Sequence, residues 1–228
     1  MCIEASGTCS DRQLPVRPQF EGVLGGSFVQ HIGGGLGKNA ARVRFVLMEF
    51  RIRRAVAADA GAIARVHVDS WRSTYAGIVP EEFLASLNLD DRAEMWGRML
   101  AAEDGLMFVA QEEAAVFGFC CGGKLREDLD SYDAELYAIY LLRENQGKGV
   151  GHGLFQALVA SLLEAGYAGM ALWVLKDNPA ARFYEHLGGK QIASKQINIG
   201  GANLEEVAYG WPKLEDVLRK GIAANGQL

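Results

Sequence analysis

Basic residues are too few in this 228-residue chain to make it positively charged. Its 23 lysines and arginines stand against 28 acidic residues, for a formal net charge of −5. Because nucleic-acid binding needs a basic surface, the composition gives no reason to expect a nucleic-acid partner. No apolar run approaches the ~20 residues of a membrane span, and the N-terminus lacks the basic start and apolar stretch of a signal peptide. We therefore expect a cytoplasmic protein with no nucleic-acid and no membrane partner.

Cysteine is scarce, and the four cysteines show no C-x-x-C or Cys/His spacing typical of zinc sites, so no metal is expected. Cys120 and Cys121 are adjacent in the apolar segment VFGFCCGG and would point to opposite faces of a strand. We interpret them as buried free thiols, which fits a reducing cytoplasm. Neither has an obvious activating partner, so a covalent role is not expected.

Glycines without a sustained hydrophobic period distinguish residues 1–47 from the rest of the chain. We predict an N-terminal extension there, either partly ordered or absent from the native protein, because Met48 opens the segment MEFRIRRA as a domain start would. The glycine-rich part GGGLGKNA lacks the first glycine and the Ser or Thr that a P-loop needs. A single domain is predicted over residues 48–214, followed by a frayed tail over residues 215–228.

Hydrophobic periodicity predicts alternating strands and helices throughout that domain. An initial strand is followed by helices that begin near Asp59, Pro80 and Asp90, with the two aspartates as N-caps. A β-hairpin and a further strand precede the segment ENQGKGVGHGLF. Next come a helix that Gly166 ends, a buried strand, a helix that Gly188 ends, and a hairpin about the pair GG in INIGGANL. This order predicts an α/β protein with a mixed sheet flanked by helices.

Four glycines at alternate positions mark a junction between a strand and a helix: Gly147, Gly149, Gly151 and Gly153. The first N–H groups of a helix have no partner within it, and the helix dipole gives them about half a positive charge. Glycines let the main chain approach a phosphate without interference from Cβ atoms. The stretch therefore predicts a ligand with a phosphate or pyrophosphate group. A dinucleotide fold is not predicted, because the spacing does not fit G-x-G-x-x-G.

The hexapeptide QGKGVG, Gln146–Gly151, matches the signature Q/R-x-x-G-x-G/A of the GCN5-related N-acetyltransferases, the GNAT superfamily. The preceding IYLLREN resembles the fourth strand of that family. The later NPAARFYEHLGG resembles its last-helix signature, with Gly189 in place of an aromatic residue. The resemblance extends from Phe50 to Trp211 and implies a GNAT-like acyl-CoA N-acyltransferase fold, with a mostly antiparallel central sheet flanked by helices.

The resemblance implies an N-acetyltransferase that moves the acetyl group of acetyl-CoA, its cosubstrate, directly to a primary amine of a small molecule or a protein. The alternative is a non-catalytic acyl-CoA-binding sensor or interaction module with the same fold. Tyr184, which is present in the last-helix signature, favours the enzyme. A homodimer is compatible with this assignment, although nothing in the sequence fixes the oligomeric state.

In the family the pyrophosphate lies on the amides of the glycine turn, and the pantetheine arm pairs with the fourth strand like an extra strand. An N–H of that strand, here that of Leu141, faces the thioester carbonyl and stabilises the oxyanion, an interaction worth ~3 kcal/mol of barrier. Lys148 either adds charge at the rim or is solvated. The resemblance thus implies the following cofactor-binding residues: Ile139, Tyr140, Leu141, Gln146, Gly147, Lys148, Gly149, Val150, Gly151, His152 and Asn178.

Tyr184 is the implied catalytic acid, because the resemblance places it beside the sulfur and a phenol with a pKa of about 10 suits a thiol leaving group. The alternative is simple packing beside Phe183. Glu135, at the start of the strand before the cofactor, is the predicted base for the amine, with a solvated strand-end glutamate as the alternative. His67 is expected to be a core histidine, and His186 to be stabilised by the last turn of a helix.

Two features bear on the acceptor. Trp71 and Tyr75 either offer an aromatic surface to a small amine or belong to the core, which is the expected role. An acidic loop is either an ordinary solvated surface or attracts a cation such as a polyamine; its residues are Glu127, Asp128, Asp130 and Asp133.

Overall fold

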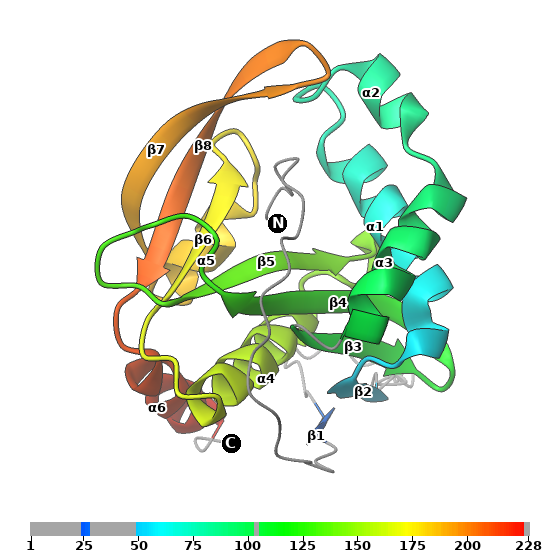
Figure 1. Ribbon diagram of the computed structural model, residues 1–228. Helices are drawn as coiled ribbons and strands as arrows, with labels where there is room; N and C mark the ends of the chain where they lie inside the picture. Colours follow the sequence, from blue (N-terminus) through cyan, green and yellow to red (C-terminus); the bar gives the residue numbers. More distant parts are fainter. Residues whose placement is uncertain (1–23, 28–48, 103–104, 226–228) are drawn as a thin grey trace, which may run out of the picture.

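An eight-stranded sheet organises the protein, and helices lie against both of its faces (Figure 1). The structure is a computed structural model that describes residues 24–27, 49–102 and 105–225. The strands, in the spatial order β1-β2-β3-β4-β5-β6-β8-β7, are β1 (Leu24–Ser27), β2 (Glu49–Arg54), β3 (Leu106–Glu112), β4 (Ala115–Lys124), β5 (Ala134–Leu141), β6 (Met170–Leu175), β7 (Lys190–Ile199) and β8 (Ala202–Trp211). The helices are α1 (Ala60–Thr74), α2 (Glu81–Ser86), α3 (Leu89–Ala102), α4 (Val150–Glu164), α5 (Ala181–His186) and α6 (Leu214–Asn225), with short 3-10 helices η1 (Ala57–Asp59) and η2 (Arg143–Asn145).

All neighbouring strands of this sheet run antiparallel except β5 and β6. The predicted mixed and mostly antiparallel sheet is therefore confirmed. β5 and β6 are paired at only two positions, Ala134 with Met170 and Glu135 with Ala171. Beyond them the two strands diverge (Figure 1). β5 continues to Leu141 with only β4 as a neighbouring strand in the described ranges.

Each face of the sheet has its own hydrophobic core. α4 and α6 cover one face, where Leu154 and Leu214 are fully buried. α1 and α3 cover the other face along β3–β5, around the buried Trp96. Cys120 and Cys121 belong to opposite cores, which confirms that they are buried free thiols on opposite faces of a strand. Burial raises the pKa of the Cys120 thiol, which makes it unreactive.

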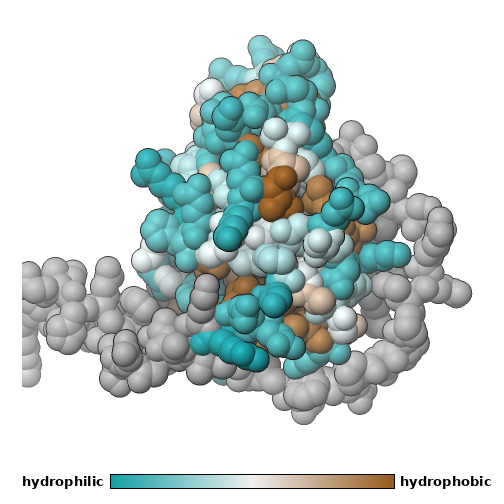
Figure 2. All heavy atoms as spheres, turned by 90° about the vertical axis from the view of Figure 1, so that its left-hand side faces the viewer, coloured by the Kyte–Doolittle hydropathy of each residue, from teal (hydrophilic) through white to brown (hydrophobic). Residues whose placement is uncertain are grey.

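The strands β6, β8 and β7 form an arm that splays away from the rest of the sheet (Figure 1). Figure 2 views the molecule from the side of this arm and shows a mostly hydrophilic surface with small apolar areas. The tip of the β7–β8 hairpin reaches back to α2, since a Cβ atom added to Gly200 would lie 2.7 Å from the Cβ atom of Phe83. The arm therefore touches the α1–α2 side of the molecule at its far end.

Left-handed glycines end two helices and form the last hairpin, as predicted. Gly166 follows α4 with a φ of 90°, and Gly188 follows α5 with a φ of 83°. Gly200 and Gly201 form the β7–β8 turn with φ angles of 58° and 88°. Other residues adopt such angles at a cost of ~1–2 kcal/mol, which explains the glycines.

The structure also explains why Gly189 stands where the family has an aromatic residue. A Cβ atom at this position would lie 2.6 Å from Cζ2 of Trp211 in β8. The Trp211 indole is held there by a hydrogen bond of 2.9 Å from its Nε1 to the carbonyl of Leu187. Trp211 therefore fills the space beside residue 189 with an aromatic ring from another strand.

The aspartates predicted to cap α1 and α3 have different outcomes. Asp59 lies at the end of η1, where its carboxylate accepts the N–H of Val56 at 2.8 Å and pairs with Arg53 at 2.7 Å. Asn88 caps α3, because its Oδ1 accepts the N–H of Asp90 at 2.8 Å. Asp59 therefore stands at the N-cap position of α1, as predicted, but its side chain makes no capping hydrogen bond to that helix. The prediction that Asp90 is an N-cap is wrong. Sequence spacing did not separate the capping side chain from a nearby acidic residue of the same capping propensity.

Within the described ranges, no helix is both long and apolar enough to cross a membrane. Of residues 1–47, the structure describes only β1, which pairs antiparallel with β2. The segment GGGLGKNA and the start at Met48 lie outside the described residues.

The C-terminal segment is a helix rather than the predicted frayed tail. Leu214 and Val217 of α6 are 0% and 7% exposed and belong to the same core as α4. The N–H of Leu214 also donates to the carbonyl of Ala168 at 2.9 Å. Leu214, Val217 and Leu218 recur at the i, i+3, i+4 spacing of an amphipathic helix. This spacing indicates a helix in the sequence, although the apolar stripe is short.

Because α6 completes a core, Leu214→Ala is expected to lower the free energy of unfolding by about 2–5 kcal/mol. Urea unfolding followed by circular dichroism measures the change. Glu215→Ala is the control, because its side chain is 72% exposed, and it should change stability by less than about 0.5 kcal/mol. Equal effects of the two substitutions would show that α6 is not docked.

Candidate functional site

The outer edge of β5 is the first part of the candidate site. The N–H of Leu142 donates to the carbonyl of Phe117 at 3.0 Å, on the β4 side. Because main-chain groups of successive strand residues point to opposite edges, those of Leu141 and Ile139 face the edge from which β6 has diverged. The carbonyl of Leu141 there accepts a hydrogen bond of 3.1 Å from Gln146 Nε2. The N–H groups of Ile139 and Leu141 thus face a side on which no described strand pairs with them.

A β-bulge determines which residues of β5 direct their main-chain groups to the outer edge. The register between β4 and β5 shifts between Cys121 and Gly122, which leaves Tyr137 as an extra residue in β5. The extra residue reverses the edge that the following main-chain groups face, a use of bulges that is common beside active sites. Gly122 makes the close approach possible, because an added Cβ atom would lie 2.6 Å from the carbonyl oxygen of Glu135.

The first two glycines of the turn are required by main-chain conformation. Gly147 and Gly149 have φ angles of 73° and 79°, in the left-handed region that favours glycine. Gly149 is the N-cap of α4. An added Cβ atom at Gly147 would meet nothing within 4 Å, so the φ angle and not crowding selects glycine there.

The next two glycines are required by packing. A Cβ atom at Gly151 would lie 3.3 Å from both Leu141 Cδ1 and Phe183 Cζ, and one at Gly153 would lie 2.6 Å from Ile52 Cδ1. These contacts hold the first turn of α4 close to β5, to α5 and to β2. The alternation of four glycines therefore has two separate physical causes, one conformational and one steric.

The start of α4 presents main-chain amides. Val150, Gly151 and His152 form its first turn, and Gly153 is the first residue whose N–H bonds back, to the carbonyl of Gly149 at 3.1 Å. Within the described residues, the N–H groups of the three preceding residues have no main-chain acceptor. With the positive end of the helix dipole, they form a site suited to an anion.

Side chains around the turn add little positive charge. His152 is half-buried, its Nε2 lies 3.2 Å from Gln156 Nε2, and burial lowers its pKa, so the ring is neutral near pH 7. Lys148 is exposed. The more distant His186 lies in the last turn of α5 with its Nδ1 2.6 Å from the carbonyl of Arg182, the place expected for it. The positive character of the turn therefore comes mainly from main-chain amides.

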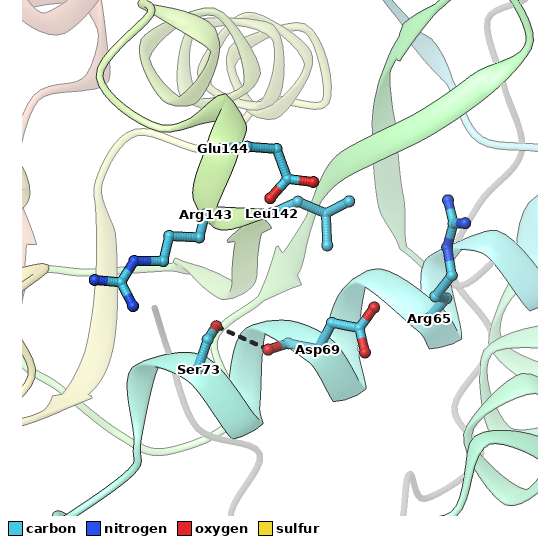
Figure 3. Close-up of a pocket in the computed structure, with 6 residues that line it drawn as sticks. All are labelled: Arg65, Asp69, Ser73, Leu142, Arg143 and Glu144. Atoms are coloured by element: carbon cyan, nitrogen blue, oxygen red, sulfur yellow. Dashed lines mark hydrogen bonds between the residues drawn. The ribbon is translucent and has the colours of Figure 1, made fainter.

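A hollow of about 300 Å³ lies between α1 and the segment that joins β5 to the glycine turn (Figure 3). Figure 3 shows Arg65 and Asp69 on α1 opposite Glu144 of η2, with Arg143 extending from the same connection. Two arginines and two carboxylates thus line the hollow, so its side chains add no net charge. The residues that line the hollow are Arg65, Asp69, Ser73, Leu142, Arg143 and Glu144.

Tyr184 is fully buried in the core on the α4 face. Its ring centroid lies 5.4 Å from that of Phe183, 6.1 Å from that of Tyr209 and 6.4 Å from that of Trp211. The phenol therefore lies among aromatic rings in a region of low polarity. The packing beside Phe183 is present, and it is compatible with a catalytic role for the hydroxyl.

Asn178 joins the two halves of the divided sheet. Its Nδ2 donates to the hydroxyl of Tyr75 at 3.1 Å, and its Oδ1 accepts the N–H of Ala180 at 2.9 Å. Tyr75 follows α1, which covers β5, whereas Asn178 lies between β6 and α5. The side chain that was predicted to bind the cofactor is buried, and its amide bonds to protein groups at both ends.

Glu135 is buried rather than solvated, since only 2% of the residue is exposed. Its Oε1 accepts from Arg126 Nη2 at 2.5 Å, and its Oε2 accepts from Arg126 Nε at 3.0 Å. The guanidinium also lies 4.5 Å from the centroid of the Tyr137 ring. The alternative of a solvated strand-end glutamate is therefore wrong, because Arg126 covers the carboxylate.

The acidic loop is partly structural. Asp133 accepts the N–H groups of Ala168 and Gly169, with the shortest distance 2.9 Å, and so anchors the entry to β6. Glu127 accepts from Lys195 Nζ of β7 at 2.6 Å. Asp128 and Asp130 are exposed, as expected for an ordinary solvated loop.

Three aromatic residues considered for function belong to the core, as expected. Trp71 and Tyr75 are 4% and 0% exposed, and Trp71 Nε1 donates to the Tyr140 hydroxyl at 2.9 Å. His67 is stacked on Tyr140 at 5.2 Å between ring centroids and accepts from Trp96 Nε1 at 3.1 Å. Burial lowers the pKa of His67 to about 3, with Arg92 as a smaller cause, so it stays neutral.

Sequence reasoning missed a polar cluster on the arm. Glu206 of β8 is 1% exposed, and Trp173 of β6 is 7% exposed. Burial raises the pKa of Glu206 to about 7. A signal was present, since Leu204, Glu206 and Ala208 alternate on one face of β8, which places a carboxylate in an otherwise apolar row.

Comparison with known proteins gives a consistent assignment. The family described as "Acetyltransferase (GNAT) family" matches residues 62–189, more than half of the chain. The chain is 42% identical over 165 residues to "Uncharacterized N-acetyltransferase YuaI" of Bacillus subtilis (strain 168), which covers 72% of this chain and 93% of that protein.

Solved structures have the same fold. YncA of Salmonella typhimurium, a protein solved with its cofactor acetyl-CoA, is 23% identical with a TM-score of 0.56 and covers 72% of this chain and 94% of that one. The PaiA N-acetyltransferase of Thermoplasma acidophilum, solved with coenzyme A, is 22% identical with a TM-score of 0.53 and covers 72% and 100%. Family match, relative and fold together show that this chain belongs to the acetyltransferase (GNAT) family.

Proposed function

We propose that this protein transfers the acetyl group of acetyl-CoA directly to a primary amine of a small molecule or a protein. Membership of the family makes it an acetyl-CoA-dependent acyltransferase. The proposal concerns the acceptor and the residues that carry the reaction. One observation supports it above others: the open edge of β5 leads directly into the glycine turn and the amides at the start of α4.

The cofactor is held, in this proposal, almost entirely by main-chain groups. The pyrophosphate accepts hydrogen bonds from the amides of residues 147–152, and the pantetheine arm pairs with Ile139 and Leu141 as an added strand would. Gln146 stabilises the end of β5 through its bond to the Leu141 carbonyl. Tyr140 turns its main-chain groups toward β4, so we assign it no direct bond to the arm. Asn178, bonded to Tyr75, acts by holding the two halves of the sheet together.

The N–H of Leu141 stabilises the oxyanion that forms when the amine attacks the thioester carbonyl. A preorganised donor of this kind contributes about 3 kcal/mol. Tyr184 gives its proton to the departing thiolate, and its apolar surroundings favour transfer to a thiolate over ionisation in the resting enzyme. Glu135 is less suited to act as the base, because both of its oxygens already accept from Arg126.

The alternative, a non-catalytic acyl-CoA sensor, makes a different prediction. A sensor binds coenzyme A but releases no thiol when amines are added to its acetyl-CoA complex. Incubation of the protein with acetyl-CoA and a panel of primary amines, with free thiol as the readout, separates the two functions. Thiol release that depends on the amine supports the enzyme.

Gly147→Ala is expected to weaken coenzyme A binding about 10-fold, because a left-handed φ at this position strains alanine by ~1–2 kcal/mol and moves the amides. Isothermal titration calorimetry measures the Kd. Gly166→Ala is the matched control: it has a φ of 90°, its added Cβ also meets nothing within 4 Å, and it lies at the other end of α4. Equal loss of affinity in both variants would contradict the anion site at the turn.

Tyr184→Phe is expected to lower kcat about 100-fold, because general acid catalysis typically contributes 10²–10⁴-fold. The Kd for coenzyme A should change little, since the ring is retained. Steady-state thiol release with an amine that the panel identifies gives kcat. Tyr209→Phe, which removes the hydroxyl of a neighbouring ring that donates to Glu185 at 3.0 Å, should retain most activity. An unchanged kcat in Tyr184→Phe would remove the tyrosine from the mechanism.

A further inference from the structure

Two buried polar atoms of the β6–β8–β7 arm have no hydrogen-bond partner among the described residues. They are Nε1 of Trp173 in β6 and Oε1 of Glu206 in β8. A buried donor or acceptor without a partner costs ~1–3 kcal/mol, so each requires an explanation. One is a donor and the other an acceptor. A single ligand that carries both complementary groups would satisfy both atoms.

An ammonium group already lies beside them. Lys195 of β7 pairs in register with Glu206, and Trp173 lies on the same face of the arm. Lys195 Nζ is 4.0 Å from the centroid of the Trp173 indole and 3.9 Å from Glu206 Oε2. Its hydrogen bonds go to Glu127. The face therefore holds a primary ammonium against an aromatic ring and two carboxylates, and leaves Glu206 Oε1 unused.

The strand register places this cluster opposite the reacting end of β5. Glu135 is paired with Ala171 in the parallel pair, so Leu175, further along β6, is level with the Ile139–Leu141 end of β5. Glu206 is the partner of Leu175. It therefore lies across the divergence from the N–H of Leu141, on the face of the arm that is opposite to α4.

We propose that Glu206, Trp173 and Lys195 form the acceptor subsite, in which Glu206 Oε1 binds and deprotonates a primary ammonium group and Trp173 Nε1 donates to an oxygen atom of the same molecule. The substrate class is a primary amine with a hydrogen-bond acceptor oxygen a few bonds from its nitrogen. Lys195 holds the carboxylates in place. The inference rests on the proposed function and assigns the role of base to Glu206 in place of Glu135.

The step balances as follows. The carboxylate of Glu206 takes a proton from the ammonium, the neutral amine forms the C–N bond, and the C–S bond breaks. The nitrogen loses a second proton from the adduct. Of these two protons, one replaces the proton that Tyr184 gives to the thiolate, and the other is released to solvent.

The surroundings of Glu206 suit this role. Burial raises its pKa to about 7; Lys195 and Arg126 oppose the shift, whereas Glu127 and Glu135 reinforce it. A base whose pKa lies near the working pH is present in its active form and still accepts a proton readily. Because the ionised form is the base, kcat/KM should rise as the pH increases through about 7.

Nuclear magnetic resonance of the four tryptophan indole N–H groups tests the subsite without turnover. Trp71, Trp96 and Trp211 donate to protein acceptors and serve as internal references. In the protein loaded with coenzyme A, 2-methoxyethylamine is expected to shift the Trp173 signal, which Trp173→Phe identifies. Butylamine, which has a CH₂ group in place of the oxygen, should shift it less. An unmoved Trp173 signal with 2-methoxyethylamine overturns the proposal.

Turnover gives a second test of Trp173. The ratio of kcat/KM for 2-methoxyethylamine to that for butylamine is measured in the wild-type protein and in Trp173→Phe. The comparison of ratios cancels the different basicities of the two amines. We expect the substitution to lower the ratio about 5-fold, as the loss of one hydrogen bond implies. An unchanged ratio overturns the assignment of Trp173.

Glu206→Gln is expected to lower kcat/KM about 100-fold and to abolish its rise with pH. Glu205→Gln is the matched control, because the neighbouring carboxylate lies on the opposite face of β8 and pairs with Lys176 at 2.8 Å; its profile should match the wild type. If calorimetry shows no coenzyme A binding, the proposed function fails. If coenzyme A binds and amines are acetylated while both variants behave alike, only the acceptor subsite fails.

The pH dependence of stability, compared between the wild-type protein and Glu206→Gln, tests the burial of Glu206 without a measurement of activity. The fold raises the pKa of Glu206 from 4.5 to about 7, so the folded state opposes its ionisation. The wild-type protein should therefore lose stability relative to Glu206→Gln as the pH rises from 4.5 to about 7. Urea unfolding across this range measures the difference, and parallel pH curves would show that the carboxylate is not buried as described.

Discussion

The short pairing of β5 with β6 is the constraint on which the rest of the structure depends. Two parallel residue pairs, Ala134 with Met170 and Glu135 with Ala171, hold the two halves of the sheet together at one end. A parallel pair that continued would satisfy the outer main-chain groups of β5 and leave no edge for a ligand. Because β6 turns away, the bulge in β5 can direct Ile139 and Leu141 toward open space. Two further contacts stabilise the arrangement of the two halves of the sheet: Asn178 bonds to Tyr75, and Gly200 lies against Phe83.

The glycine turn shows how one sequence feature can serve two needs. Gly147 and Gly149 adopt left-handed angles that turn the chain from β5 into α4. Gly151 and Gly153 have ordinary angles but stand where a side chain would collide with Leu141 and Ile52. The first pair exposes the amides, and the second pair holds the helix that bears them against the sheet. An anion site built of main-chain groups needs both, because amides that move lose their preorganisation.

Two buried carboxylates, one on each side of the divergence between β5 and β6, have different surroundings. On β5, both oxygens of Glu135 accept hydrogen bonds from Arg126, one from Nε and one from Nη2. On β8, Glu206 Oε2 lies 3.9 Å from the ammonium of Lys195, and its Oε1 has no hydrogen-bond partner in the described residues. A carboxylate in that condition has a raised pKa and an unmet hydrogen bond. The two buried carboxylates therefore differ in how fully protein groups satisfy them, a difference that position along a strand does not reveal.

The sequence by itself determined the order of the elements, the glycine turn at the start of a helix, the core positions of His67, Trp71 and Tyr75, and the family resemblance, because these follow from local periodicity, turn chemistry and short motifs. It misassigned the cap at Asp90 and the helix at Leu214–Asn225, where local signals were weak or shared by neighbours. Only the tertiary structure decided which glycines serve packing, that Arg126 covers Glu135, and that Trp173, Lys195 and Glu206 meet on one face. These residues come from separate strands and loops, and the register between strands, which brings them together, is set by long-range pairing and not by the neighbours of each residue in the chain.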